Sequence, residues 1–287
     1  MFSIVIPARN EAATIGPLVA ELSRLEKIKE VVVVDDGSAD ATAQEAQKNG
    51  ARVLSHDVPS GNGAAVKTGL KNTSSEFVII IDADGQHGVE DVRKLMAFPV
   101  ERDLVVGARP FSWFRFRDFG NLILSATASL LCGKKIPDLT SGLRRIRRSK
   151  ALLFYDLYPQ GFSFPSTSTI MFITSFFSVA YIPIENRPRP AHASRSKLRP
   201  LRHGFKFLSI IYRIILMSYP LRFFIPIGML CLCFGVIWVT RTMIRASAVS
   251  AAGVLFVLSG LTLILFGAIA DQLSHIRRSI GALKERS

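Results

Sequence analysis

The sequence predicts an α/β domain with a doubly wound, mostly parallel sheet, followed by two helices that cross a membrane as a hairpin. Short β-branched runs alternate with helical patterns from residue 1 to about 107, and two apolar runs lie near the C-terminus. Charge separates the same two parts, because residues 1–120 hold 14 basic and 17 acidic residues while residues 121–287 hold 22 and 5. At 287 residues and 49% apolar, the chain can bury a sizeable core, which excludes disorder and fibrous repeats.

Five short runs predict the strands, and four of them are continuously apolar, as expected of strands buried on both faces of a parallel sheet. The five runs are Phe2–Pro7, Val31–Asp35, Arg52–Leu54, Phe77–Asp82 and Leu104–Gly107. The helices predicted between them are Thr14–Leu25, Ala41–Asn49 and Ala64–Lys71. Ligands bind outside the carboxyl ends of the strands in such a sheet, so the residues that follow each strand form the candidate site.

Two apolar runs, residues 221–240 and 249–270, each match the ~20 residues that a helix needs to cross ~30 Å of hydrocarbon. A pair of buried core helices is the alternative, and the lack of a polar face on either run disfavours it. Basic residues flank the outer ends of the two runs and are sparse between them. This pattern predicts that the N-terminal domain and both termini lie on the cytoplasmic side.

Residues 205–219 place Lys206 and Arg213 on one face of a largely apolar stretch, which predicts a helix in the headgroup layer; an extension of the first span is the alternative. The predicted organisation is a domain at 1–200, a juxtamembrane helix at 201–220, the hairpin at 221–270 and a basic tail at 271–287. The basic residues beside the membrane explain the positive charge without nucleic acid as a partner.

The fourth strand ends in Asp82, Ala83 and Asp84, whose two carboxylates lie on the same side of an extended chain. Together with the carbonyl of Gln86, they form a ligand set for Mg²⁺ or Mn²⁺ that leaves positions for the oxygens of a diphosphate. The alternative is that these acids only end the strand and cap the next helix. No GxGxxG or GxxxxGKS/T pattern occurs, so a dinucleotide-binding fold of the usual type and a P-loop nucleotidase are not supported.

The order of the motifs is more specific than any one of them. PARNE, DDGS, GNGAAV, DADGQH and GAR follow one another in residues 1 to about 110, which resembles the catalytic domain of glycosyltransferase family 2. The segment Asp138–Arg144, DLTSGLR, looks like the DxTSGFR element of the polyprenyl-phosphate branch, with Leu143 in place of the usual aromatic residue. Ser196, Lys197 and Leu198 look like its SKL element. With the hairpin, nearly the whole chain resembles a dolichyl- or undecaprenyl-phosphate glycosyltransferase, which implies a GT-A fold.

The resemblance implies roles for residues along the carboxyl edge of the sheet. The residues that would line the nucleotide pocket are Pro7, Ala8, Asn10 and Glu11, with Asp36 near the ribose or base. Asp82, Asp84 and Gln86 would hold the metal and the donor diphosphate, and Arg109 would approach a phosphate. The residues of the phosphate-binding wall would be Ser141, Arg189, Ser196 and Lys197. Arg189 lies eight residues before Lys197, a long spacing, so Arg187 and Arg195 compete with it for one role.

The implied reaction moves a sugar from a nucleoside-diphosphate sugar, of the UDP-glucose or GDP-mannose type, to a polyprenyl phosphate with inversion. A lipid phosphate is anionic at neutral pH and needs no general base, so positioning and charge stabilisation are the work left to the protein. Other glycolipid acceptors would need a base. A processive synthase, which carries a QxxRW element that is absent here, and a non-catalytic sugar-nucleotide sensor are further alternatives. The sugar, the base, the lipid length and the oligomeric state stay open.

Three further patterns give expectations of their own. The glycine-rich turn Gly61–Ala65 predicts backbone N–H groups that hold an anion, with a plain turn as the alternative. The basic cluster from Arg144 to Lys150 predicts a solvated or membrane-facing surface. The three cysteines, Cys132, Cys231 and Cys233, predict buried thiols without a redox or metal role.

Overall fold

The computed structural model divides the chain into two compact units, residues 1–211 and 212–287. It describes all residues except 111–115, 162, 186–219, 247 and 285–287. The predicted juxtamembrane helix, together with Arg187, Arg189, Arg195, Ser196 and Lys197, lies outside the described residues.

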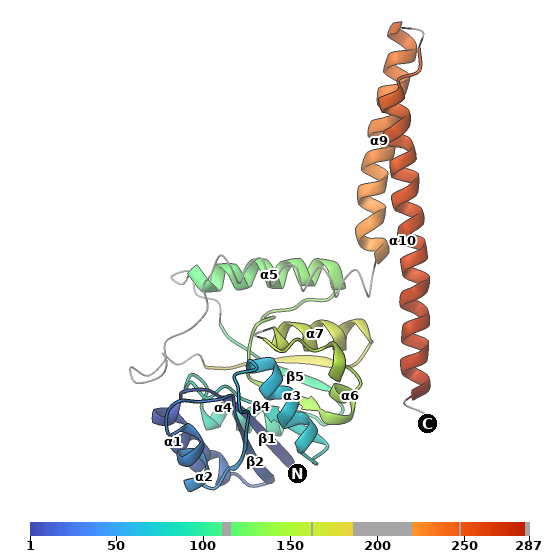
Figure 1. Cartoon of the computed structure of the whole chain (residues 1–287). Helices are drawn as coiled ribbons and strands as arrows, with labels where there is room; N and C mark the ends of the chain where they lie inside the picture. Colours follow the sequence, from blue (N-terminus) through green and yellow to red (C-terminus); the bar gives the residue numbers. More distant parts are fainter. Residues whose placement is uncertain (111–115, 162, 186–219, 247, 285–287) are drawn as a thin grey trace. The chain divides into compact units, whose positions relative to one another are not determined.

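The first unit is built on a seven-stranded sheet with the order β3-β2-β1-β4-β6-β5-β7 (Figure 1). The strands are β1 (Phe2–Ala8), β2 (Ile28–Asp35), β3 (Arg52–Ser55), β4 (Phe77–Ile80), β5 (Leu104–Ala108), β6 (Arg144–Arg147) and β7 (Val179–Pro183). β1 to β4 pair in parallel, β5 is parallel to β7, and β6 runs antiparallel between β4 and β5. The five predicted strands and the mostly parallel sheet are confirmed, while β6 and β7 were not predicted.

Helices cover both faces of this sheet (Figure 1). The helices of the first unit are α1 (Ala12–Ser23), α2 (Thr42–Lys48), α3 (Asn62–Asn72), α4 (Val89–Ala97), α5 (Phe116–Cys132), α6 (Arg148–Leu152) and α7 (Phe164–Thr174), with a 3₁₀ turn at Tyr155–Leu157. Alternate residues of β1 serve the two faces: Ile4 and Ile6 join the core with α1, and Val5 packs against α3. A Cβ on Gly69 of α3 would overlap the Val5 side chain, so this helix lies unusually close to the sheet.

The basic cluster that begins at Arg144 was expected at a surface, and this expectation was wrong for Arg144 and Arg145, which lie in a buried strand; Arg147, Arg148 and Lys150 are half-buried. Arg144 and Arg145 are fully buried, because β6 lies between two neighbours and alternation sends their side chains to opposite faces of the sheet. Arg145 donates to the carbonyl oxygens of Leu95 and Pro99 at the end of α4 and lies over the ring of Phe77. Carbonyl groups at a helix end lack intrahelical donors, and the guanidinium supplies them.

The second unit is a hairpin of α9 (Pro220–Ala246) and α10 (Ala251–Lys284). Its segments Pro220–Arg245 and Ala251–Ser274 are long and apolar enough to cross a membrane, with mean hydropathy of 2.3 and 2.4, and little of either is buried in the structure. Helices of a soluble core would be mostly buried, so the two spans are the interpretation that fits.

Glycines spaced seven apart form the contact between the two helices. A Cβ on Gly260 would lie 2.7 Å from the carbonyl oxygen of Gly228, and one on Gly235 would lie 2.9 Å from that of Gly253. The backbones therefore touch directly, as in other membrane helices that meet at small residues. Large side chains point outward. Of the three cysteines, Cys132 is buried, Cys231 is half-buried and Cys233 is exposed, so the expectation of buried thiols is confirmed for Cys132 and was wrong for Cys233.

Candidate active site

The loops that follow β1 and β2 brace each other at the carboxyl edge of the sheet. Asn10 adopts a left-handed conformation with φ of 57°, its N–H donates to Ser38 Oγ at 2.9 Å, and its side-chain oxygen accepts from Ala39 N at 2.8 Å. The N–H of Glu11 donates to Thr42 Oγ1 at 2.9 Å. Pro7 and Ala8 are buried in β1. The Asn10 side chain therefore shapes the loop, a local role that the sequence did not indicate.

Asp36 holds the glycine-rich turn that leads into α3. Its carboxylate accepts hydrogen bonds from Ser60 N at 2.7 Å and Gly61 N at 2.8 Å, and its Oδ1 lies 2.9 Å from His56 Nδ1. Burial by itself would raise the pKa of Asp36, but these hydrogen bonds favour the charged form and lower the pKa below its usual value. The carboxylate is a positioning group for the turn, and its predicted place near the ribose or base stays a prediction.

The turn itself does not offer the anion site that was expected, because its donors are occupied. Gly63 N donates to the carbonyl oxygen of Gly161 at 2.8 Å, and Ala64 N donates to that of Gln160 at 2.9 Å. A Cβ on Gly63 would collide with the carbonyl oxygen of Pro159, so only glycine allows this approach. The expectation of an anion held by these N–H groups was wrong: the glycines join α3 to the segment before α7.

The acidic turn after β4 lies against the segment that precedes β6. Asp84 Oδ1 accepts from Gln86 N at 3.1 Å, and Gly85 has a φ of 72°, so the chain reverses sharply after the second carboxylate. A Cβ on Gly142 would overlap the Asp82 carboxylate. Asp82 and the TSG segment, 60 residues apart in sequence, therefore meet through the missing side chain of Gly142.

Electrostatics at this turn favour a cation. Burial and the charge of Asp84 raise the pKa of Asp82, while Arg109 and Arg144 partly offset both effects. Burial lowers the pKa of His87, and its Nδ1 has no hydrogen-bond partner among the described residues. A bound divalent cation would stabilise both carboxylates in their charged form.

The donor set suits Mg²⁺ or Mn²⁺. Within the part of the chain that the structure describes, no third His, Cys, Asp or Glu joins these carboxylates to complete an all-protein metal site. Mg²⁺ is commonly held by one or two carboxylates together with substrate phosphates, so this small ligand set fits. Asp82, Asp84 and Gln86 are the residues that could hold the ion.

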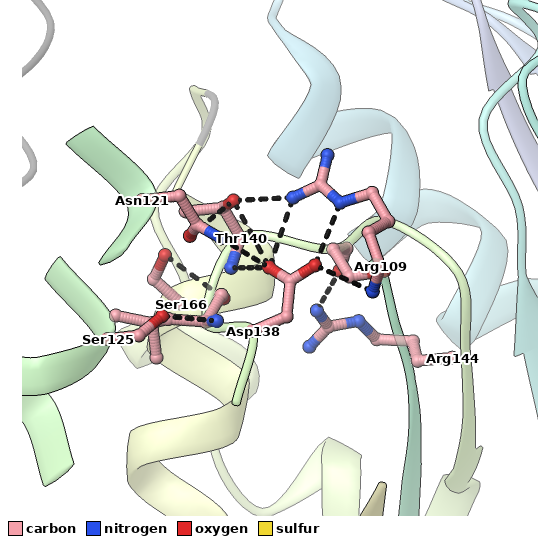
Figure 2. A network of polar contacts seen from close by, with 9 residues as sticks. Arg109, Asn121, Ser125, Asp138, Thr140, Arg144 and Ser166 are labelled. Carbon is pink, nitrogen blue, oxygen red and sulfur yellow. Dashed lines mark hydrogen bonds and ion pairs between the residues drawn. The ribbon is translucent and has the colours of Figure 1, made fainter. Parts of the chain in front are cut away.

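Arg109, which follows β5, is fixed by Asp138 (Figure 2). Its Nε lies 2.8 Å from Asp138 Oδ2, and its Nη2 lies 3.0 Å from Oδ1 and 2.7 Å from Thr140 Oγ1. Asn121 of α5 donates to the same carboxylate at 3.1 Å. Burial alone would raise the pKa of Asp138, but the hydrogen bonds and the charge of Arg109 lower it. Two parallel bonds hold the guanidinium in one direction, which a single contact would not do.

Ser141 and Arg144 form a second, fully buried part of the edge. Ser141 Oγ has no hydrogen-bond partner among the described residues. Arg144 donates to the carbonyl oxygens of Ser141 and Pro165 and to Ser168 Oγ, and burial lowers its pKa to about 10. Its charge acts on Asp82. Sequence reasoning missed Arg144 as a site residue, although it is the final arginine of the DLTSGLR motif, and it missed His87 in DADGQH.

Comparison with known proteins agrees with the geometry. Residues 3–152 match the profile of Glycosyl transferase family 2, and residues 219–276 match that of the GtrB C-terminal hairpin. Glycosyltransferase AglJ of Haloferax volcanii is 28% identical over 292 residues, which cover 96% of this chain and 94% of that protein. Dolichyl-phosphate hexose transferase of the same organism is 29% identical, over 70% of this chain and 88% of that one.

A third relative is polyprenol monophosphomannose synthase of Mycolicibacterium smegmatis, 29% identical over 67% of this chain and 79% of that protein. The fold is shared with glucosyl-3-phosphoglycerate synthase from Mycobacterium tuberculosis, solved with Mg²⁺ and uridine diphosphate. That likeness has a TM-score of 0.61 at 24% identity, over 75% of this chain and 79% of that one. Because the family profile spans more than half of the chain, the protein belongs to glycosyltransferase family 2, with a GT-A fold followed by a two-helix membrane hairpin.

Proposed function

We propose that the protein transfers a sugar from a nucleoside-diphosphate sugar to a polyprenyl phosphate at the membrane, with inversion at the anomeric carbon. The observation that carries the proposal is the contact of the acidic turn with the Gly142 segment: the Asp82 carboxylate lies where a Cβ of Gly142 would be, and the charges of Arg109 and Arg144 partly offset the rise in the pKa of Asp82 that burial causes. The same chain has two helices long and apolar enough to span a membrane. Relatives named for dolichyl-phosphate, polyprenol and undecaprenyl-phosphate transfer support this acceptor class.

The donor would bind on the acidic side of the edge. Asp82, Asp84 and Gln86 would hold Mg²⁺ or Mn²⁺, which when bound supplies positive charge against the departing diphosphate. Solved structures of glucosyl-3-phosphoglycerate synthase contain these ions with UDP or UDP-glucose, which supports a metal here. The nucleotide would lie along Pro7, Ala8 and Glu11, over loops whose shape is set by Asn10 and Asp36.

The acceptor phosphate would bind on the basic side. Arg109, held in direction by Asp138, and Ser141, whose buried hydroxyl is unpartnered in the described structure, would contact it. Arg189, Ser196 and Lys197 stay proposed members of this wall. One phosphate oxygen would bond to the anomeric carbon while the bond from that carbon to the diphosphate oxygen breaks on the opposite face. The phosphate is already anionic, so no protein base has to remove a proton.

The catalytic domain and both termini would face the cytoplasm, where nucleotide sugars are made and where the flanking basic residues favour retention. The proposed organisation keeps the sequence boundaries: a catalytic domain at 1–200, a juxtamembrane helix at 201–220, the hairpin at 221–270 and a basic tail at 271–287.

The test is a donor screen with the purified full chain in detergent, undecaprenyl phosphate, Mn²⁺ and a panel of radiolabelled UDP- and GDP-sugars. We expect label to enter the organic phase from one donor, and expect EDTA and Asp84→Asn to abolish it. Glu26→Gln is the matched control, because Glu26 is exposed in the loop before β2 at the opposite edge of the sheet and should leave transfer unchanged.

Other outcomes separate the alternatives. Label in diacylglycerol or ceramide, and none in the polyprenyl phosphate, would replace the proposed acceptor. If the wild type transfers no sugar from any donor and the Asp84→Asn variant still binds nucleotide, a sensor would be favoured over an enzyme. Retained transfer in EDTA would remove the metal from the proposal and leave the reaction class intact.

A further inference from the structure

Helix α5 exposes large apolar side chains that a helix of a soluble domain would bury. Its apolar side chains Leu122, Ile123 and Leu130 are 43%, 47% and 80% exposed. At about 100° per residue, these three positions and Ala126 fall within an arc of about 100° on the helix surface, so they form one apolar stripe. A soluble helix turns such a stripe toward its core, and α5 turns it away.

The side of α5 that faces the protein includes the buried Ala128 and Cys132, and polar side chains of the helix hydrogen-bond to residues 136–139 before β6. Asn121 donates to Asp138, Ser125 Oγ accepts from Leu139 N at 3.0 Å, and Ser129 Oγ accepts from Ile136 N at 2.9 Å. Figure 2 shows Asn121 and Ser125 pointing toward the segment that contains Asp138. Because these bonds fix the rotation of the helix about its axis, the apolar stripe cannot turn inward without breaking the contacts that hold Asp138.

The chain itself indicates what covers the stripe. Two membrane spans in the same polypeptide keep the first unit tied to a bilayer. Lys134 and Lys135 are exposed directly after the end of α5, where cationic side chains would meet anionic headgroups. An outward apolar stripe with basic residues at its border is the pattern of a helix that lies in the membrane interface.

We infer that α5 lies in the lipid interface with Leu122, Ile123 and Leu130 inserted, as a membrane contact of the first unit separate from the two spans. Its inward face then holds the Asp138 carboxylate, and through it Arg109, at the level of the lipid headgroups. This inference depends on the exposed stripe and the spans, and it would stand whichever sugar or acceptor the site uses.

The test measures lipid contact at single sites of the full chain in nanodiscs that contain anionic lipid. Cysteines replace Ile123 and Leu130 in turn, in a background with the three native cysteines changed to alanine, and each carries an environment-sensitive fluorophore. We expect blue-shifted emission and loss of most of the signal with lipids spin-labelled near the headgroup, and little quenching by aqueous iodide.

Val100 is the matched control. It is also apolar, 53% exposed and in the first unit, but it precedes β5 and so lies at the amino edge of the sheet, whereas α5 follows the carboxyl end of β5. A fluorophore there should respond to iodide and not to spin-labelled lipid.

Two results would overturn the inference. Equal iodide quenching at Ile123, Leu130 and Val100 would mean that water covers the stripe. A different pattern would mean that a second copy covers the stripe instead of lipid: the fluorophores would be quenched by iodide in nanodiscs with one chain, and protected from both iodide and spin-labelled lipid in nanodiscs with two chains.

Discussion

The sheet of the first unit and the hairpin of the second bury opposite kinds of residue. In the sheet, the large side chains of Ile4, Val5 and Ile6 are fully buried on both faces. In the hairpin, glycines meet at the contact and large side chains such as Leu230 point outward. The hydrophobic effect buries apolar side chains in water, but it does not drive two helices together in lipid, where close packing of the backbones stabilises their contact instead.

Helix α5 follows the second pattern although it belongs to the first unit. Its residues Ser125 and Ala128 are buried against the protein, whereas Leu122, Ile123 and Leu130 are exposed, as the large side chains of the hairpin are. The difference teaches that the solvent around each segment, rather than its position in the chain, decides which face is buried. Four changes test how far this division holds.

The largest effect is expected from filling the space beside Asp82. In Gly142→Ala the new methyl group overlaps the Asp82 carboxylate, and a displacement of about 1 Å in such a group costs roughly 100-fold in rate. Initial rates of sugar transfer measure it. Gly120→Ala is the control, since nothing lies within 4 Å of a Cβ at Gly120. Equal rates for both variants would show that Asp82 has no fixed place in the reaction.

The next effect concerns the buried ion pair at the edge. Asp138→Asn removes the charge opposite Arg109, and we expect about 2 kcal/mol of lost stability, below the 3–5 kcal/mol typical of fully buried pairs because Arg109 is partly exposed. Thermal unfolding in detergent, followed by near-ultraviolet circular dichroism, reports the loss. Glu90→Gln, in an exposed pair with Arg93, should shift the midpoint hardly at all. A similar shift in both would place no special weight on the buried pair.

The hairpin should respond to size at its glycines and tolerate changes at its outer face. Gly260→Leu adds a side chain where the backbone of Gly228 approaches, so the two helices must separate, at a cost of about 1 kcal/mol or more. Cross-linking between cysteines placed on α9 and α10 should become slower. Leu265→Ala, on an outward position, should cross-link at the normal rate. Unchanged cross-linking in the first variant would contradict the glycine contact.

The smallest expected effect is a pH dependence of stability. The pKa of Asp36 is lowered in the folded protein, so its charged form stabilises the fold at neutral pH. This contribution is present above the unfolded value of about 3.9 and is lost as the pH falls through the lower, folded value. The difference in unfolding midpoint between the wild type and Asp36→Asn should therefore shrink below about pH 4. A difference that stays constant from neutral pH to acid would refute the charge effect.

Sequence predicted the parts of the fold in which one strong signal dominates. The strands from Phe2 to Gly107 were predictable because continuous apolar runs indicate buried strands. β6 was not, because the letters RRIR carry no such signal, and only the neighbouring carbonyls that accept from Arg144 and Arg145 make burial of two charges affordable. Which side of α5 faces the protein depends on its contacts with Asp138 and Leu139, which lie outside the helix, so the sequence of the helix alone does not reveal it.

The candidate site divides in the same way. Asp82, Asp84 and Arg109 could be named from motif order, and the structure brings them to one edge. The roles of Asn10 and Asp36 in bracing loops were hidden, because their partners Ser38, Ser60 and Gly61 are set by tertiary folding. The occupied donors of Gly63 and Ala64 were hidden for the same reason, since their acceptors lie almost 100 residues away.

The seven-residue spacing of the hairpin glycines limits how this part of the chain can vary in length. Gly228 and Gly235 on α9, and Gly253, Gly260 and Gly267 on α10, recur every seven residues. Each residue added between two of them turns everything beyond it by about 100° around the helix axis, which would bring an outward leucine or valine into the contact. Exchange of one outer apolar residue for another leaves the glycines on the same side of the helix. The hairpin should therefore accept many substitutions on its outer face while rejecting single insertions and deletions.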